Sequence, residues 1–136
     1  MYAAEYGNYD CVEALLEKSP DLSLCDAFGC NALHYALWTE RPDQFIVRVL
    51  CQSGVPLHKR DKEGRTSLHL ASKRNQAKLI PILIEYHAEL DICDDQGNSP
   101  LMMAAAEGHY ACVQLLAEAG ARITVKVSGL EFAFVQ

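Results

Sequence analysis

The stretches that decide the fold are NALHYA at 31–36, TSLHLA at 66–71 and SPLMMA at 99–104, which are three copies of one pattern. Each copy ends on an alanine, and a fourth alanine stands in the same column near the start of the chain: Ala3, Ala36, Ala71 and Ala104. These alanines are 33, 35 and 33 residues apart. Because one common helical repeat is roughly 33 residues long, four units account for nearly all of the 136 residues.

Two further columns keep the same period. Leucines recur at spacings of 35, 33 and 33 residues: Leu15, Leu50, Leu83 and Leu116. Glycines recur at spacings of 35 and 33 residues: Gly29, Gly64 and Gly97. The two extra residues fall after Ala36 in the alanine column and before Leu50 in the leucine column. The second unit therefore carries an insertion, which we place at Glu40 to Asp43.

The units share one order of elements. An Asp and a Gly three residues apart indicate a tight turn, because glycine readily adopts positive φ: DAFG at 26–29, DKEG at 61–64 and DDQG at 94–97. A short small-residue segment follows, and then a longer apolar segment with helical spacing: CVEALL at 11–16, IVRVLC at 46–51, LIPILI at 79–84 and CVQLLA at 112–117. The pattern predicts two short helices and a hairpin turn per unit, and units that stack to bury their apolar faces.

The quoted stretches resemble the Thr-Pro-Leu-His-x-Ala signature of ankyrin repeats, and AEGHYACVQLLAEAGA at 106–121 is similar to the second half of that repeat. The resemblance covers about residues 1–125 and implies an all-α solenoid of stacked helix-turn-helix units with short β-hairpin loops. We expect one domain over 1–126, with units at about 1–25, 26–60, 61–93 and 94–126. The tail, 127–136, is expected to be an extended strand or the cut edge of a longer array.

Two prolines modify the expected helices. Pro42 and Asp43 suit the first turn of the second helix of their unit, with the proline near the first helical position and the acid near the positive end of the helix dipole. Pro81 falls inside the corresponding helix of the third unit. We therefore expect Pro81 to bend that helix or to leave one carbonyl unpaired.

Composition excludes several classes of protein. With 50% hydrophobic and 22% charged residues, the chain is typical of globular proteins. Its apolar runs, such as 79–84, are far shorter than the roughly 18 residues that cross a bilayer. A formal net charge of -6 argues against general affinity for nucleic acid. The first residues lack the basic and apolar regions of a secretory signal, so we expect an intracellular protein of the cytoplasm or nucleus.

The six cysteines fit the repeat better than they fit a disulfide framework or a metal site. Five of them recur in register with the units at apolar or strand positions, and the sequence has no CxxC pair. We expect reduced structural thiols, of which Cys30, placed in a hairpin, is the reachable one.

The histidines also fit structural roles. His34 and His69 hold the signature position, where the resemblance implies hydrogen bonds from the imidazole to the backbone of neighbouring hairpins. His58, His87 and His109 lack the spacing of metal ligands. Because no phosphate-binding loop, zinc-protease motif or nucleophile elbow occurs, we expect no catalytic residue, no metal, no cofactor and no enzymatic activity.

Another protein or peptide is the expected partner. The resemblance implies a concave face made by the hairpins and the first helices. The candidate contacts on this face are Phe28, Tyr35, Trp38, Lys62, Arg65, Lys73, Arg74, Asn98 and Glu107. Phe28 and Trp38 are large aromatic residues at nominally exposed positions of one unit, and tryptophan is frequent at interface hot spots. The alternative for Trp38 is local packing over the longer turn between helices.

Basic residues concentrate beside these aromatic residues. Residues 59–74 hold six of the twelve basic residues and only two acidic ones. The six are Lys59, Arg60, Lys62, Arg65, Lys73 and Arg74. The stretch is either a solvated polar face or the floor of a groove for an acidic or phosphorylated peptide.

Two other functions stay open. Trp38, Tyr35 and Glu40 are candidates for a cage that holds a methylated lysine, because aromatic ring faces attract quaternary ammonium groups. The chain is alternatively a structural segment of a longer repeat array, either monomeric or weakly self-associating through exposed repeat edges.

Overall fold

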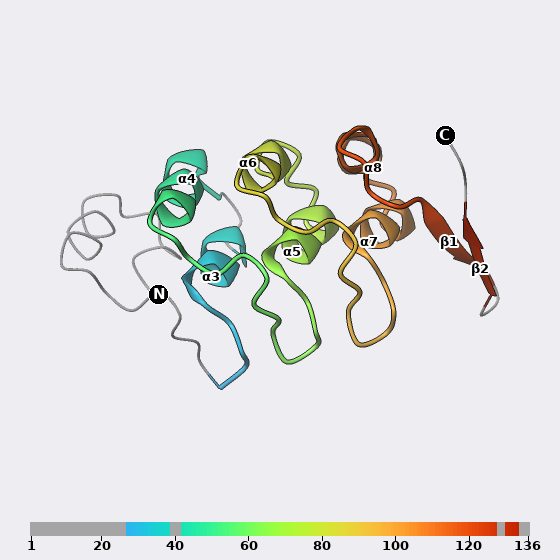
Figure 1. Cartoon of the computed structure of the whole chain (residues 1–136), viewed down its shortest axis with the longest axis horizontal. Coiled ribbons are helices and arrows are strands. Elements are labelled where there is room, and N and C mark those ends of the chain that lie inside the picture. The colour runs from blue at the N-terminus through green and yellow to red at the C-terminus, as the bar shows by residue number, and fades with distance from the viewer. Residues whose placement is uncertain (1–26, 39–41, 128–129, 134–136) are drawn as a thin grey trace.

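The computed structural model describes residues 27–38, 42–127 and 130–133. Within these ranges, three helix pairs stand side by side along the long axis and are followed by a pair of strands (Figure 1). The elements are α3 (Ala32–Trp38), α4 (Gln44–Gln52), α5 (Ser67–Lys73), α6 (Ile80–Glu85), α7 (Pro100–Ala106), α8 (Tyr110–Glu118), β1 (Thr124–Val127) and β2 (Leu130–Ala133). The expected first unit, 1–25, lies outside the described residues.

The helices form two layers. In the inner layer α3 packs against α5 and α5 against α7, while in the outer layer α4 packs against α6 and α6 against α8. The loops that precede the inner helices all project to the same side, away from both layers (Figure 1). These loops are hairpin turns, closed by hydrogen bonds such as Asp61 N–H to the Arg65 carbonyl at 2.9 Å. The predicted solenoid of helix-turn-helix units is confirmed.

The repeated alanines and leucines form the core between the layers. The described members of both columns are buried: Ala36, Ala71, Ala104, Leu50, Leu83 and Leu116. Alanine on the inner helices lets neighbouring helices approach closely, and each buried leucine contributes about 1.5–3 kcal/mol of hydrophobic stabilisation. Alanine and leucine therefore recur with the period of the units because each stacked unit buries the same positions.

Side chains fix where several helices begin. The Asp43 carboxylate accepts hydrogen bonds from Phe45 N–H at 2.7 Å and Ile46 N–H at 3.3 Å, which makes Asp43 the N-cap of α4. Pro42 thus lies one residue before the cap, not at the first helical position. Ser99 caps α7 by accepting from Met102 N–H at 3.2 Å.

Pro81 lies in the first turn of a helix and not in its interior, so the expected bend does not arise. α6 begins at Ile80, which places Pro81 in the first turn of the helix. There a backbone N–H has no intrahelical partner, and the missing donor of proline costs nothing. The consequence is a short helix of 6 residues, compared with 9 in α4 and in α8.

Neighbouring hairpin turns are joined by backbone hydrogen bonds. Lys62 N–H donates to the Phe28 carbonyl at 2.7 Å, and Asp95 N–H donates to the Glu63 carbonyl at 3.0 Å. Gly64 has φ +78°, and a Cβ at this position would lie only 2.4 Å from an Asp95 side-chain oxygen. The turn and its close neighbour therefore both require glycine here.

The chain after α8 pairs as two antiparallel strands. Thr124 lies opposite Ala133, and Val127 lies opposite Leu130, so β1 and β2 form a hairpin with each other. Strand structure thus begins at Thr124, before the residues at which we placed the start of the tail.

Candidate functional site

The signature histidines bind backbone groups, as expected. Nδ1 of His34 accepts from Asn31 N–H at 3.2 Å, so Nε2 carries the proton and donates to the Arg65 carbonyl at 3.1 Å. His69 repeats this arrangement between Thr66 N–H, at 3.1 Å, and the Asn98 carbonyl, at 2.8 Å. Burial lowers the pKa of His69, which keeps its imidazole neutral. Both rings thus join each unit to the hairpin of the next.

The expectation that Cys30 is the reachable thiol was wrong. Its exposed fraction is 2%, because the chain turns back into the stack after Gly29, which has φ +77°. Cys51 and Cys112 are also buried, and burial raises the pKa of the Cys51 thiol to about 11. Among the described cysteines, Cys93 is the exposed one. None of these four forms a disulfide.

A cleft of about 330 Å³ opens beside the first described hairpin. Its lining is Phe28, Cys30, Tyr35, Trp38, Asp61, Lys62 and Glu63, and we name it the aromatic cleft. Phe28 is 59% exposed and Trp38 is 51% exposed, although both are large apolar side chains. The structure therefore brings four of the predicted contact residues to one cleft: Phe28, Tyr35, Trp38 and Lys62.

The walls of the aromatic cleft are held in place. The Lys62 ammonium lies over the Phe28 ring, 6.0 Å from its centroid. The Asp61 carboxylate accepts from Glu63 N–H and Arg65 N–H, each at 2.9 Å, and so fixes the turn that carries Lys62. The turn on the Lys62 side of the cleft is thus fixed by hydrogen bonds within the chain.

Two of the six clustered basic residues are engaged by carboxylates. Arg65 pairs with Glu63 at 2.9 Å, and Arg60 lies 3.7 Å from Asp95. Arg60 also donates to the Cys93 carbonyl at 2.7 Å, which links two hairpins. These two guanidinium groups therefore support the hairpins, and the predicted cationic floor is smaller than the sequence indicated.

The other predicted contacts lie elsewhere. Asn98 is half-buried, and its carbonyl accepts from His69 while its N–H donates to Asp94. Glu107 is exposed at the end of α7. Lys73 and Arg74 are exposed at the end of α5. Neither the aromatic cleft nor any other described cleft gathers all nine predicted residues.

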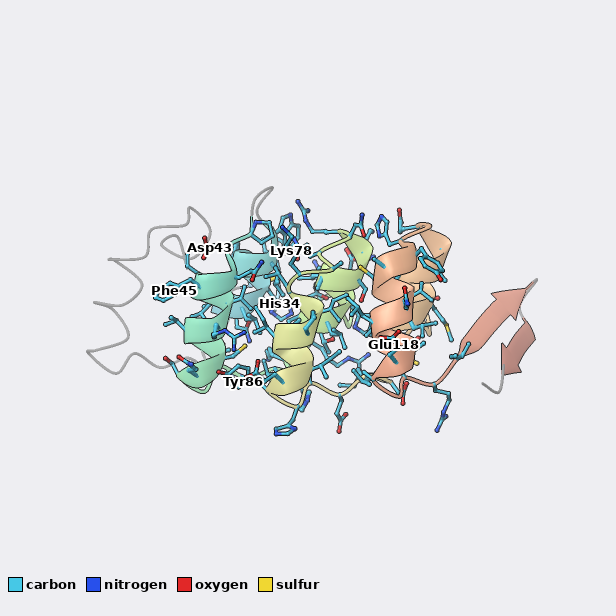
Figure 2. The ribbon with its side chains drawn as sticks, turned by 90° about the horizontal axis from the view of Figure 1, so that it is seen from above. His34, Asp43, Phe45, Lys78, Tyr86 and Glu118 are labelled. Carbon is cyan, nitrogen blue, oxygen red and sulfur yellow. The ribbon has the colours of Figure 1, made fainter. Side chains whose placement is uncertain are left out.

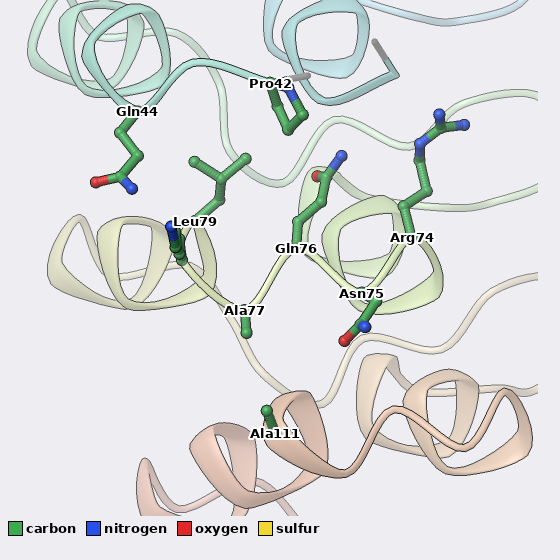
Figure 3. Close-up of a pocket in the computed structure, with 9 residues that line it drawn as sticks. Pro42, Gln44, Arg74, Asn75, Gln76, Ala77, Leu79 and Ala111 are labelled. Atoms are coloured by element: carbon green, nitrogen blue, oxygen red, sulfur yellow. The ribbon is translucent and has the colours of Figure 1, made fainter. Parts of the chain in front are cut away.

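A second cleft, of about 630 Å³, lies where the two helices of each unit are joined (Figure 3). Its lining is Pro42, Gln44, Arg74, Asn75, Gln76, Ala77, Lys78, Leu79 and Ala111, and we name it the turn-side cleft. Arg74 thus belongs to this cleft and not to the aromatic one. Lys78 was missed by the sequence mapping, although residues 64–84 contain four Lys and Arg residues and no acid.

Comparison with protein families supports the repeat directly. A family model described as ankyrin repeats in three copies matches residues 40–127, and a second ankyrin model matches residues 1–46. The chain belongs to the ankyrin-repeat family. Ankyrin repeats generally serve as protein-protein interaction modules and are typically not catalytic.

Several ankyrin-repeat proteins are similar to this chain. Human ankyrin repeat domain-containing protein 63 is 35% identical over 82 residues, which are 60% of the chain and 22% of that protein. Ankyrin repeat protein nuc-2 of Neurospora crassa is 34% identical over 94% of the chain and 12% of its own length. Ankyrin repeat and SAM domain-containing protein 6 of Danio rerio is 32% identical over 87% of the chain and 16% of its own length. The chain spans less than a quarter of each of these relatives.

The described residues carry neither a membrane-spanning helix nor a metal-binding cluster. No helix among them is long and apolar enough to cross a bilayer. Nor do they hold a group of three or more His, Cys, Asp or Glu residues able to bind a metal ion.

Proposed function

We propose that this ankyrin-repeat chain is a protein-interaction module that binds a segment of a partner protein in the aromatic cleft. The observation that carries the proposal is the exposure of Phe28 and Trp38, at 59% and 51%, on the walls of one cleft. Exposed aromatic side chains that share a cleft are typical of interface anchors, and such hot spots each cost roughly 2 kcal/mol or more when truncated.

The shape of the cleft favours an apolar anchor from the partner. Phe28 lies on a hairpin turn, and Trp38 lies at the end of α3, so the cleft extends from the hairpins along the inner helix. A partner side chain inserted there would cover both aromatic surfaces. Lys62 offers a cation at the same cleft for a partner carboxylate.

A methylated lysine is a less suitable ligand for the same cleft. The Lys62 ammonium already lies over the Phe28 ring, and a second cation beside it would be repelled. Glu40, the proposed acidic member of the cage, lies outside the described residues. The described geometry therefore favours an apolar and acidic segment.

The proposal is tested with random peptides displayed on phage and selected on the wild-type chain. Trp38→Ala and Phe28→Ala should each weaken the selected peptides roughly 30-fold, which corresponds to about 2 kcal/mol. Tyr110→Ala is the matched control, because Tyr110 is 76% exposed but lies on the outer helix α8. Equal affinities for wild type and for a folded Trp38→Ala variant would place the binding face elsewhere.

A further inference from the structure

The described lining of the turn-side cleft carries positive charge and no carboxylate. Among the residues that the structure describes, Arg74 and Lys78 are the cationic side chains of this lining, which includes neither Asp nor Glu. Lys73 is exposed on the adjoining end of α5. In a chain of net charge -6, such a concentration of one sign is a local exception.

These cations lack the intramolecular partners that other basic residues of the chain have. Among the described residues, Arg48, Arg60 and Arg65 form ion pairs with Glu85, Asp95 and Glu63. No ion pair or side-chain hydrogen bond engages Lys73, Arg74 or Lys78 within that part of the structure. No carboxylate in the described ranges thus forms an ion pair with these three cations.

Helix stability does not account for Lys78. Lys73 and Arg74 lie at the end of α5, where the helix dipole favours a cation. Lys78 lies directly before Leu79, the N-cap of α6, where the dipole disfavours a cation. An anion bound in the cleft would offset this cost and the mutual repulsion of the three cations.

The turn that carries these residues is anchored on both sides. Asn75, held at φ +57°, accepts from the Cys112 thiol of α8 at 3.6 Å. The buried Gln76 amide donates to the Leu37 carbonyl of α3 at 2.7 Å. Figure 3 shows the Arg74 and Gln76 side chains on the side of Pro42, and the Asn75 side chain directed toward the side of Ala111. The turn is thus positioned before binding, which limits the entropy lost when a ligand binds.

Two described carboxylates lie at this edge of the stack, Asp43 before α4 and Glu107 at the end of α7, and neither lines the turn-side cleft. Figure 2 shows Asp43 and Lys78 at one edge of the helices and Tyr86 at the opposite edge. Asp43 is not part of the cleft lining, and its carboxylate caps α4. Its charge therefore does not fill the cleft.

We propose that the turn-side cleft binds an acidic side chain of the partner segment, a glutamate, aspartate or phosphorylated residue, through Arg74 and Lys78. This role rests on the protein-binding function proposed for the aromatic cleft. It specifies in addition that the partner segment carries negative charge. Arg74 supplies a planar fork of donors that matches a carboxylate or phosphate, and Lys78 supplies a point charge.

The test uses three fluorescent hexapeptides that lack aromatic and aliphatic anchors: one of six glutamates, one of alternating glycine and phosphoserine, and one of six glutamines. Fluorescence anisotropy with the full chain should show that at least one acidic peptide binds more tightly than the glutamine peptide, and more weakly at higher salt. Of the two acidic peptides, the one that binds more tightly identifies carboxylate or phosphate as the preferred group.

Variants connect this binding to the cleft. Arg74→Gln/Lys78→Gln should weaken the acidic peptide about tenfold or more, since each charged hydrogen bond contributes appreciably. Arg122→Gln, which removes one exposed cation after α8, should change affinity less than twofold. Undiminished binding by the folded double variant, or equal loss in Arg122→Gln, would overturn the proposal, as would preference for a DNA duplex over both acidic peptides.

The proposals for the aromatic cleft and for the turn-side cleft can be refuted independently of each other. The acidic peptides have no apolar anchor for the aromatic cleft, and Trp38→Ala removes no charge, so this variant should leave their affinity unchanged. Loss of acidic-peptide binding in Trp38→Ala would show that the cleft assignment is wrong, whereas failure of the phage-selected peptides to depend on Trp38 would count against the aromatic cleft alone.

Discussion

Replacing His69 by alanine tests whether the signature histidines hold adjacent units together. The ring bridges Thr66 N–H, 3.1 Å from Nδ1, and the Asn98 carbonyl, 2.8 Å from Nε2. His69→Ala leaves the buried Thr66 N–H without this partner and leaves a cavity, whereas the Asn98 carbonyl keeps its hydrogen bond from Asp94 N–H at 2.9 Å. A buried polar group left unpaired costs about 1–3 kcal/mol, so we expect a loss of about 3 kcal/mol in the free energy of unfolding.

The same variant should change how stability depends on pH. Burial lowers the pKa of His69 in the folded state below its ordinary value of 6.5, so the unfolded chain binds a proton more readily. The contribution of His69 is therefore complete above pH 6.5 and decreases as the pH falls toward the folded-state pKa, by at most about 1.4 kcal/mol per pH unit. The stability difference between wild type and His69→Ala should accordingly shrink from pH 7.5 to pH 5.5.

Equilibrium urea unfolding at several pH values measures both effects. His87→Asn is the control, because His87 is exposed and asparagine tolerates its φ of +66°. Two results would refute the bridging role of His69. One is a loss of less than about 1 kcal/mol in the free energy of unfolding of His69→Ala at pH 7.5, and the other is a stability difference from wild type that stays constant down to pH 5.5.

Three other perturbations test the packing and the turns. Gly64→Ala should cost about 1–3 kcal/mol of unfolding free energy, more than Gly54→Ala, because the new Cβ would meet Asp95 whereas nothing lies within 4 Å of Gly54. Equal losses in urea unfolding would contradict the close contact. Leu83→Ala should cost about 2–5 kcal/mol by the same assay, and half-buried Val113→Ala less. In the folded chain Cys93 should react with maleimide before Cys30, Cys51 and Cys112, as peptide mass spectrometry would show; early labelling of Cys30 would contradict its burial.

Much of the fold could be predicted from the sequence because stacking is periodic. A residue such as Leu83 is buried since its counterparts Leu50 and Leu116 meet the same neighbours in every unit. The role of His69 was expected from the resemblance to ankyrin repeats, because it holds the histidine position of their signature. The repeat register does not, however, determine features in which one unit differs from the others. Pro81 determines where α6 begins, and the positive φ of Gly29 directs Cys30 into the stack. Both effects depend on backbone geometry, which the alignment of equivalent residues does not reveal.

The candidate site was less predictable than the fold. The resemblance to ankyrin repeats placed Phe28 and Trp38 on one face, and the structure brings them to one cleft. Arg65 was predicted to face a partner but pairs with Glu63, because ion pairs depend on the reach of long side chains. Lys78 was missed because it lies in the turn between helices, beyond the positions that the family pattern assigns to the concave face.

The central claim, that a partner segment occupies the aromatic cleft, is tested most directly by the fluorescence of Trp38, the single tryptophan of the chain. A phage-selected peptide is titrated into the wild-type chain while the emission spectrum is recorded. Trp38 is 51% exposed in the free chain, so the account predicts that its emission shifts to shorter wavelength as the bound segment covers it. Saturable binding with an unchanged emission spectrum would contradict the account.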